Sequence, residues 1–235
     1  MNAAGGTSPA SDRIIVALDV STKTEALHLV DELKDCISLF KIGLQLYTAA
    51  GPEIIDEVIR RGSHVFLDLK FHDIPNTVAG AVRSAATLGV RMLTIHLSGG
   101  GEMIEAAVRA KGQGTIVLGV TVLTSSTDFT LKEIGVPAEM KDQVRRLAEL
   151  AAAHGTDGVV ASPHEVEGLR ALLGRSQIIV TPGVRPTGTD PGDQKRFMTP
   201  RDAVAAGADY LVIGRPITAA SDPRAAVQGI LNELS

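Results

Sequence analysis

The sequence predicts an α/β fold, a single-domain (β/α)8 TIM barrel, and three observations carry this prediction. Short apolar segments alternate with segments of helical spacing eight times along the chain. The length of 235 residues is common for one barrel domain. No glycine fingerprint follows the first apolar segment, where Asp19-Val-Ser-Thr22 stands. The alternative, a doubly wound open sheet, is therefore less favoured.

The first half of the chain contains four strand–helix units. Short apolar segments predict strands at residues 14–19, 39–43, 64–70 and 91–97. Apolar residues recur at helical spacing in the segments 22–34, 51–61, 75–88 and 102–110. Pro52 and Pro75 fit the first turns of two of these helices. The run Ser98-Gly-Gly-Gly101 is interpreted as a tight turn.

The second half contains four more units. Strands are predicted at residues 115–121, 158–161, 177–181 and 209–213, and helices at 141–154, 163–173, 200–207 and 222–234. Residues 124–130 form a polar loop. Residues 183–196 are rich in Gly and Pro. We interpret them as a lid that closes over phosphate, with Arg185 and Gln194 as its contact residues.

The terminal segment and the composition narrow the possible functions. Residues 1–12 are small and polar, without a basic start or an apolar core. We expect a disordered tail rather than a secretory signal, followed by one barrel domain at residues 13–235. No apolar run reaches the roughly 18–20 residues that span a bilayer. The formal net charge of -4 and the aromatic content of 3% argue against a nucleic-acid surface.

Cysteine and histidine usage points to a reducing compartment and to no metal. Cys36 is the only cysteine, so it cannot form an internal disulfide, and we expect a cytoplasmic protein. We interpret Cys36 as a small buried hydrophobic residue rather than a catalytic thiol. His72 and His164 have no partners at ligand spacing, so no metal site is inferred.

Three ionisable residues gather where the central strand passes into a helix. Asp68 and Lys70 have the same parity along the strand, so they share a face. Asp73 lies near the helix cap, two residues before Pro75. A surface ion pair beside a cap is the simpler explanation. The flanking residues indicate a buried strand, however, where charges are costly unless they are paired or used. We therefore favour a functional site.

Most predicted strands end in polar residues, which packing alone does not predict. In a barrel these ends meet around one mouth. They carry Asp19, Lys41, Asp68 with Lys70, His96, Thr121 to Thr124, Ser162, Arg185, and Gly214 with Arg215. Lys41 lies within an apolar strand, so we expect it to pair with an acid such as Asp68. His96 fits a hydrogen-bonded core histidine or a ligand contact equally well.

The loops after the last two strands have the composition of a phosphate site. Gly183 and Arg185 follow the seventh strand, and Gly214 and Arg215 end the eighth. Barrels of this type commonly bind phosphate there through backbone N–H groups. Glycine allows close approach of the backbone, and arginine binds phosphate oxygens in a fork. Turn glycines beside solvated arginines are the alternative, and the barrel context favours phosphate.

Several of these segments resemble the orotidine 5'-phosphate decarboxylase family. They are Val16-Ala-Leu-Asp19, Lys41-Ile-Gly43, Asp68-Leu-Lys-Phe-His-Asp-Ile-Pro-Asn-Thr77, Val120-Thr-Val-Leu-Thr124, Thr181-Pro-Gly-Val-Arg185, Gly192-Asp-Gln194 and Val212-Ile-Gly-Arg215. The resemblance covers nearly all of the chain after the tail. It implies a carboxy-lyase that converts orotidine 5'-monophosphate (OMP) to UMP, the last step of de novo pyrimidine nucleotide synthesis. No metal or organic cofactor is implied.

The resemblance also implies a role for each candidate residue. Lys41, Asp68, Lys70 and Asp73 form an alternating charged array beside the reacting carbon C6, which Lys70 protonates. Asp68 also crowds the substrate carboxylate. Asp19 and Lys41 hold the ribose hydroxyls, and Thr124, with Ser126, contacts the pyrimidine. The phosphate ligands are Arg185, Gln194, Gly214 and Arg215. Asp73 and Thr77 reach into the site of the neighbouring subunit, which implies a homodimer.

Two rival functions remain at this stage. A magnesium-dependent sugar-phosphate decarboxylase or aldolase-type barrel of the same superfamily resembles the chain in its Asp68-x-Lys70-x-x-Asp73 core. The stretch from His72 to Thr77 favours the nucleotide enzyme. A non-catalytic sensor of nucleotide phosphate would keep the glycine and arginine of the last strand. It would have no need of the charged array.

Overall fold

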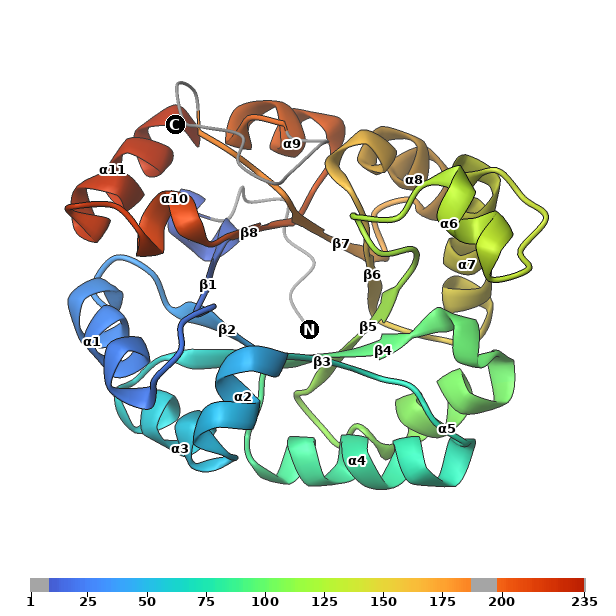
Figure 1. Ribbon diagram of the computed structural model, residues 1–235, viewed down its shortest axis with the longest axis horizontal. Helices are drawn as coiled ribbons and strands as arrows, with labels where there is room; N and C mark the ends of the chain where they lie inside the picture. The colour runs from blue at the N-terminus through green and yellow to red at the C-terminus, as the bar shows by residue number, and fades with distance from the viewer. Residues whose placement is uncertain (1–8, 187–197, 235) are drawn as a thin grey trace.

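Eight parallel strands close into one barrel, and helices surround it (Figure 1). The structure, a computed structural model, describes residues 9–186 and 198–234. The strands pair in sequence order, and β8 closes the barrel against β1. They are β1 (Ile14–Ala17), β2 (Leu39–Gly43), β3 (His64–Phe71), β4 (Met92–His96), β5 (Ile116–Val120), β6 (Gly158–Val160), β7 (Ile178–Pro182) and β8 (Tyr210–Ile213). The predicted (β/α)8 barrel is confirmed.

The strands are apolar because both of their faces are buried. Side chains of one parity fill the barrel interior, and side chains of the other parity pack under the helices. The interior cluster consists of Ile15, Ala17, Leu39, Phe66, Met92, Leu118, Val180 and Val212. A larger cluster joins the outer strand faces to the helices. Strands covered on both sides read as short continuous apolar runs, which is the pattern that the sequence shows.

The main helices lie where helical spacing predicted them, with ends that differ by a few residues. They are α1 (Lys23–Leu33), α3 (Glu53–Arg60), α4 (Pro75–Thr87), α5 (Gly101–Ala110), α7 (Met140–Ala153), α8 (Val166–Leu173), α9 (Pro200–Ala206) and α11 (Pro223–Leu234). In α1 the side chains of Ala26, Leu29, Val30 and Leu33 form one buried stripe. The helix starts where the Thr22 hydroxyl accepts a hydrogen bond from the Glu25 N–H.

Three short helices were not predicted. They are α2 (Leu44–Ala50), α6 (Asp128–Glu133) and α10 (Arg215–Thr218). The segment of α6 was assigned in part to a polar loop, but Thr127 and Thr130 cap this helix reciprocally. Helices of one or two turns carry too few apolar positions to show a period, so local capping and tertiary contacts decide them.

Two expectations fall wholly or partly outside the described residues. The expected tail, residues 1–12, is described only from residue 9, and Ala10–Arg13 form a short 3-10 helix next to β1 and β8. The described structure therefore begins before the expected boundary at residue 13. The expected lid is described only at its first residues, Gly183 to Pro186. There Val184 forms an isolated parallel bridge with Met198.

Two aspartates tie neighbouring strands together at the amino-terminal end of the barrel. The Asp157 carboxylate, just before β6, accepts a hydrogen bond from the Val117 N–H of β5 at 2.8 Å and pairs with Lys111. The Asp209 carboxylate, just before β8, accepts from the Ile179 N–H of β7 at 2.8 Å and pairs with Arg170. The same arrangement of hydrogen bonds thus links two separate strand pairs, β5 with β6 and β7 with β8. Each carboxylate satisfies a backbone donor of a neighbouring strand.

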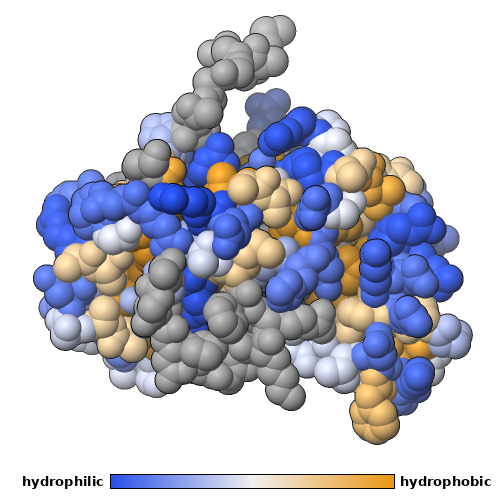
Figure 2. All heavy atoms as spheres, turned by 90° about the horizontal axis from the view of Figure 1, so that it is seen from above, coloured by the Kyte–Doolittle hydropathy of each residue, from blue (hydrophilic) through white to orange (hydrophobic). Residues whose placement is uncertain are grey.

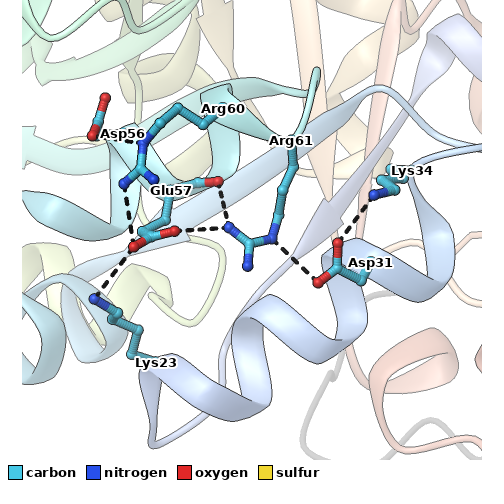
Figure 3. A network of polar contacts seen from close by, with 7 residues as sticks. All are labelled: Lys23, Asp31, Lys34, Asp56, Glu57, Arg60 and Arg61. Atoms are coloured by element: carbon cyan, nitrogen blue, oxygen red, sulfur yellow. Dashed lines mark hydrogen bonds and ion pairs between the residues drawn. The ribbon is translucent and has the colours of Figure 1, made fainter.

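An ion-pair network joins α1 to α3 on the outside of the barrel (Figure 3). Arg61 is its centre, because its guanidinium donates to Asp31 on α1 at 3.2 Å and to Glu57 on α3 at 2.8 Å. Arg60 pairs only with residues of its own helix, Asp56 and Glu57. Arg61 therefore couples the two helices, and the Lys23–Glu57 ion pair at 3.8 Å is a second, longer link between them.

Polar side chains dominate the outer surface in the view of Figure 2, where hydrophobic residues form small separate groups. This follows from the amphipathic helices, whose apolar stripes face the strands. Within the described residues, no helix has both the length and the apolar character needed to cross a membrane.

Candidate active site

The larger cavity of the barrel lies at the carboxyl ends of the strands and has a volume of about 470 Å³. Active sites of TIM-barrel enzymes lie at this end, in the loops that follow the strands. A second cavity, of about 440 Å³, lies at the opposite end among Arg13, His64, Arg91 and Tyr210. The first cavity also contains the predicted charged residues, so it is the candidate active site.

Four charged residues form an alternating chain along one wall of this cavity. The Lys41 ammonium donates to Asp19 Oδ1 at 2.9 Å and lies 3.8 Å from Asp68 Oδ2. The Lys70 ammonium donates to Asp68 Oδ1 at 2.9 Å. Lys41 is only 8% exposed, and a buried ammonium is tolerated because two carboxylates flank it. The expected pairing of Lys41 with an acid is confirmed, with Asp19 as the nearer partner.

Three neighbouring strands, β1 to β3, position these residues. Asp19 lies just beyond β1, Lys41 lies in the middle of β2, and Asp68 lies on β3. The strands pair in register so that Ala17 lies beside Lys41 and Gly43 beside Asp68. A side chain on Gly43 would meet the Lys41 ammonium at 3.0 Å. A glycine at this position therefore leaves the space that the lysine occupies.

The Lys70 backbone departs from the regular strand conformation on which the side-chain alternation of Asp68 and Lys70 was predicted. Its φ is +53°, the only positive φ of a non-glycine residue in the described chain. The pairing of β3 with β4 shifts register between Leu67 and Phe71, as it does at a β-bulge. Lys70 and Asp68 do share the cavity, but a bulge rather than simple alternation brings them together. Such a conformation costs on the order of 1–3 kcal/mol and persists only where the surroundings hold it.

The cavity wall also contains the glycines and arginines that follow the last two strands. Gly183, Arg185, Gly214 and Arg215 all line it. Arg185 is buried, and its backbone N–H donates a hydrogen bond to the Met198 carbonyl at 3.0 Å. Gly183 has a φ of +83°, a conformation that glycine adopts without steric cost. The charged chain and this arginine group thus line one and the same cavity.

The rest of the wall is mostly apolar. Leu123 and Thr124 come from the loop after β5, and Gln45 comes from α2. The lining also includes Ala17, Phe66, Val120, Val122, Val160, Pro182, Val184 and Val212. An apolar wall with a few convergent polar groups is the usual form of a small-molecule site.

The predicted site residues divide into three groups. Eight of them line the cavity, namely Asp19, Lys41, Asp68, Lys70, Thr124, Arg185, Gly214 and Arg215. Asp73 and Thr77 are exposed and lie outside the cavity lining of their own chain. Asp73 lies near the helix cap as expected, directly before the N-cap residue Ile74, and its carboxylate accepts a hydrogen bond from the Ile74 N–H at 2.7 Å. Gln194 lies outside the described residues.

Two polar residues near the site were missed by the sequence reasoning. Gln45 lines the cavity from α2, a helix that was not predicted. Thr94 contacts both Asp68 and Lys70 from β4. A single hydroxyl inside the apolar strand Met92–His96 was the available signal for Thr94. Gln45 had no comparable signal.

His96 lies close to the charged chain but outside the cavity lining. It is half-buried, and its ring centroid is 5.5 Å from that of His72. The pKa of His96 is lowered from its ordinary 6.5, chiefly by burial and further by the neighbouring His72 and Lys70, while Asp68 acts in the opposite direction. Within the described residues, no group of three His, Cys, Asp or Glu side chains is arranged to hold a metal ion.

Comparison with known proteins assigns the chain to a family. The family model described as "Orotidine 5'-phosphate decarboxylase / HUMPS family" matches residues 12–230. The chain belongs to this family. The orotidine 5'-phosphate decarboxylase of Moorella thermoacetica is 50% identical over 234 residues, which are 96% of this chain and 93% of the relative. The resemblance found in the sequence segments is thus confirmed.

Further relatives and a solved structure agree with this family assignment. An orotidine 5'-phosphate decarboxylase of Actinobacillus succinogenes is 52% identical over 222 residues, 93% of this chain and 96% of the relative. The crystal structure of the orotidine 5'-phosphate decarboxylase from Lactobacillus acidophilus superimposes with a TM-score of 0.84 at 37% identity. The match covers 95% of this chain and 99% of that one.

Proposed function

We propose that this protein is a carboxy-lyase that decarboxylates OMP to UMP without a cofactor, the last step of de novo pyrimidine nucleotide synthesis. The observation that carries the proposal is the alternating chain Asp19–Lys41–Asp68–Lys70 in a cavity that is also lined by two arginines. The family assignment and the printed names of the relatives support the same reaction.

The chemistry requires electrostatic stabilisation of a carbanion. When the bond between C6 and the carboxylate breaks, CO₂ leaves and the electron pair stays on C6, where the pyrimidine ring delocalises it poorly. An ammonium aimed at C6 stabilises this charge and then transfers a proton to it. Lys70 has this role in our proposal, and it regains its proton from solvent after the product leaves. The flanking carboxylate of Asp68 keeps the ammonium in place.

In this proposal the remaining cavity residues bind different parts of the nucleotide. We assign Asp19 and Lys41 to the ribose hydroxyls and Thr124, with Ser126, to the pyrimidine. Asp68 lies against the substrate carboxylate. Arg185, Gly214 and Arg215, together with Gln194, bind the phosphate. Binding energy from the phosphate, distant from C6, is then available for orienting the reacting ring.

The active form in this proposal is a homodimer in which Asp73 and Thr77 complete the partner's site. Both side chains are exposed at the corner between β3 and α4. Ile74 between them is 67% exposed, and Leu44, after β2, is 60% exposed. These apolar side chains follow the carboxyl ends of two adjacent strands, on the side of the barrel that contains the cavity. Exposed apolar groups of this kind mark interaction surfaces.

We also assign the enzyme to the cytoplasm. The assignment rests on the biosynthetic reaction and on the free thiol of Cys36, which suits a reducing compartment.

The test is the loss of OMP ultraviolet absorbance with purified protein in the presence of EDTA. Conversion to UMP is expected, because the proposed site uses only side chains. Failure of folded protein to convert OMP would reject the substrate assignment. Turnover of a sugar phosphate that depends on added magnesium would instead support the rival enzyme class.

A further inference from the structure

Thr94 is a buried residue at the centre of the charged chain to which no role has been assigned so far. It lies on β4 and has no exposed surface. Its hydroxyl oxygen accepts a hydrogen bond from the Lys70 backbone N–H at 2.9 Å. The same hydroxyl lies 3.0 Å from Asp68 Oδ1. One side chain thus contacts both the backbone of the proposed proton donor and the carboxylate beside it.

The directions of these two hydrogen bonds follow from the groups involved. A backbone N–H can only donate, so the Thr94 oxygen is the acceptor for Lys70. A carboxylate can only accept, so the Thr94 hydroxyl proton points at Asp68. The hydroxyl therefore has a single orientation, and the two hydrogen bonds reinforce each other as a chain.

The Lys70 N–H needs this partner because the strand is irregular at this point. The register of β3 against β4 shifts between Leu67 and Phe71, so the regular ladder of backbone hydrogen bonds is interrupted there. Lys70 also has the unusual φ of +53°. The Thr94 hydroxyl takes the place of a ladder carbonyl and satisfies a donor that the bulge leaves without one.

Asp68 is held by the same group. Its Oδ1 accepts from both Thr94 and the Lys70 ammonium, and its Oδ2 faces Lys41 at 3.8 Å. Without the hydroxyl, the carboxylate keeps only the two lysine side chains as partners and is held less firmly. The Lys70 backbone would lose its hydrogen-bond acceptor at the same time.

We propose that Thr94 is a positioning residue, whose hydroxyl holds the Lys70 backbone in its left-handed conformation and directs the Lys70–Asp68 pair toward the substrate. Its role in turnover rests on the proposed function. The residue does not line the cavity, so it does not contact the substrate itself. It acts through Lys70 and Asp68.

The kinetic test compares Thr94→Val, which keeps the shape but lacks the hydroxyl, with Thr94→Ser, which keeps the hydroxyl. For T94V we expect kcat on OMP to fall by about 10- to 100-fold, because small displacements of a catalytic group have effects of this size. KM should change by less than about threefold, since phosphate and ribose contacts remain. T94S should stay within about threefold of the wild-type kcat.

Two kinetic outcomes would overturn the proposal. One is a wild-type kcat in T94V. The other is an equal loss of kcat in T94S and T94V, which would mean that kcat depends on the packing of the Thr94 side chain and not on its hydroxyl. If T94V does not fold, Thr94→Ala carries the same expectation, because it also lacks the hydroxyl and introduces no polar group.

A structural test separates this inference from the proposed function. In the crystal structure of T94V we expect Lys70 to leave positive φ, or its ammonium to move beyond hydrogen-bonding distance of Asp68. An unchanged Lys70 would overturn the inference. If the wild-type protein does not convert OMP, the proposed function fails, and this crystallographic comparison still decides the role of Thr94.

Discussion

Lys70 combines a strained backbone with a side chain that is held at the cavity wall. The left-handed φ removes its side chain from the regular alternation of β3, and Asp68 pairs with its ammonium at 2.9 Å. Strain of this kind at one residue is found at functional positions, where surrounding contacts hold it. The residue is therefore the most informative single position to change.

Lys70→Ala should abolish turnover while UMP binding is largely retained. The variant loses both the proton donor and the cation that stabilises the carbanion, so kcat should fall by at least about 10³-fold. UMP carries no carboxylate at C6, and its phosphate and ribose contacts involve other residues. Turnover is measured by ultraviolet absorbance and UMP binding by calorimetry. Lys34→Ala is the control, because Lys34 pairs with Asp31 on α1, away from the cavity. Equal loss of UMP binding and turnover in K70A would contradict the proton-donor role.

The pKa of His96 depends on the charge of Lys70, although His96 does not line the cavity. Its lowered pKa keeps the imidazole neutral at pH 7, and Lys70 is one of the causes. Removal of this cation in K70A should therefore raise the His96 pKa, which an NMR titration of the imidazole protons measures. K34A should leave it unchanged. A His96 pKa that stays constant or falls in K70A would show that the two groups do not interact.

The lowered pKa of His96 also has a consequence for stability. Its folded pKa lies below the ordinary 6.5, so the unfolded chain binds the proton more readily. The stability contributed by neutral His96 is therefore present above pH 6.5 and decreases as the pH falls below that value.

At the scale of elements, Arg61 is the central link between α1 and α3, beside a longer Lys23–Glu57 ion pair at 3.8 Å. Arg61 joins Asp31 to Glu57, whereas Arg60 pairs within its own helix. The pKa of Glu57 is lowered from its ordinary 4.5, chiefly by its hydrogen bond from Arg61. The pKa of Asp31 is lowered from 3.8, first by Lys34 and then by Arg61. Lowered carboxyl pKa values stabilise the fold above the unfolded values, and this contribution is lost as the pH falls through the folded ones.

Arg61→Met should lower the melting temperature slightly at pH 7. The difference in melting temperature between R61M and wild type should shrink as the pH falls below 4.5, the ordinary pKa of Glu57, and then below 3.8, the ordinary pKa of Asp31. The reason is that protonated Asp31 and Glu57 no longer pair with the guanidinium. Thermal unfolding across this pH range measures the effect. Arg60→Met is the matched control and should have a smaller effect, because Arg60 does not connect two helices. A difference between R61M and wild type that is constant with pH would rule out these carboxylates as its source.

At the scale of the whole molecule, the proposed site needs two chains. Asp73 is exposed and lies outside the cavity of its own chain, whereas Lys70 lines that cavity. If Asp73 serves the partner's site, a mixed dimer of one Asp73→Asn chain and one Lys70→Ala chain has both changes in the same site. One site of that dimer then contains both lesions, and the other contains neither.

A heterodimer of K70A and D73N should therefore regain about half of the wild-type activity, since one of its two sites is intact. The variants are co-expressed with different tags, and the mixed dimer is purified and assayed on OMP. The control is a heterodimer of K70A with Asp68→Asn, whose two lesions lie in the cavities of their own chains and leave neither site intact. Activity of the first heterodimer no higher than that of the control would reject the shared site.

The sequence by itself determined the fold and most of the polar residues that line the cavity. Eight apolar segments that alternate with amphipathic ones predict a parallel sheet covered by helices, and eight such units in a chain of this length match a closed barrel, whose inner face is filled by its own side chains. Polar residues at the ends of such strands must meet at one mouth. For this reason Asp19, Lys41, Asp68 and Arg185 could be identified before any coordinates were known.

The tertiary structure alone decided the local geometry of the chain of charges. The left-handed φ of Lys70 and the register shift beside it depend on the pairing of β3 with β4, and no local sequence pattern encodes that pairing. The two contacts of Thr94 depend on the same pairing, since the residues lie 24 and 26 positions apart in the chain. Asp73 likewise matches the sequence motif, yet its position outside its own cavity follows only from the corner between β3 and α4. Side-chain alternation determines which face a residue takes, whereas contacts between distant segments determine what it touches.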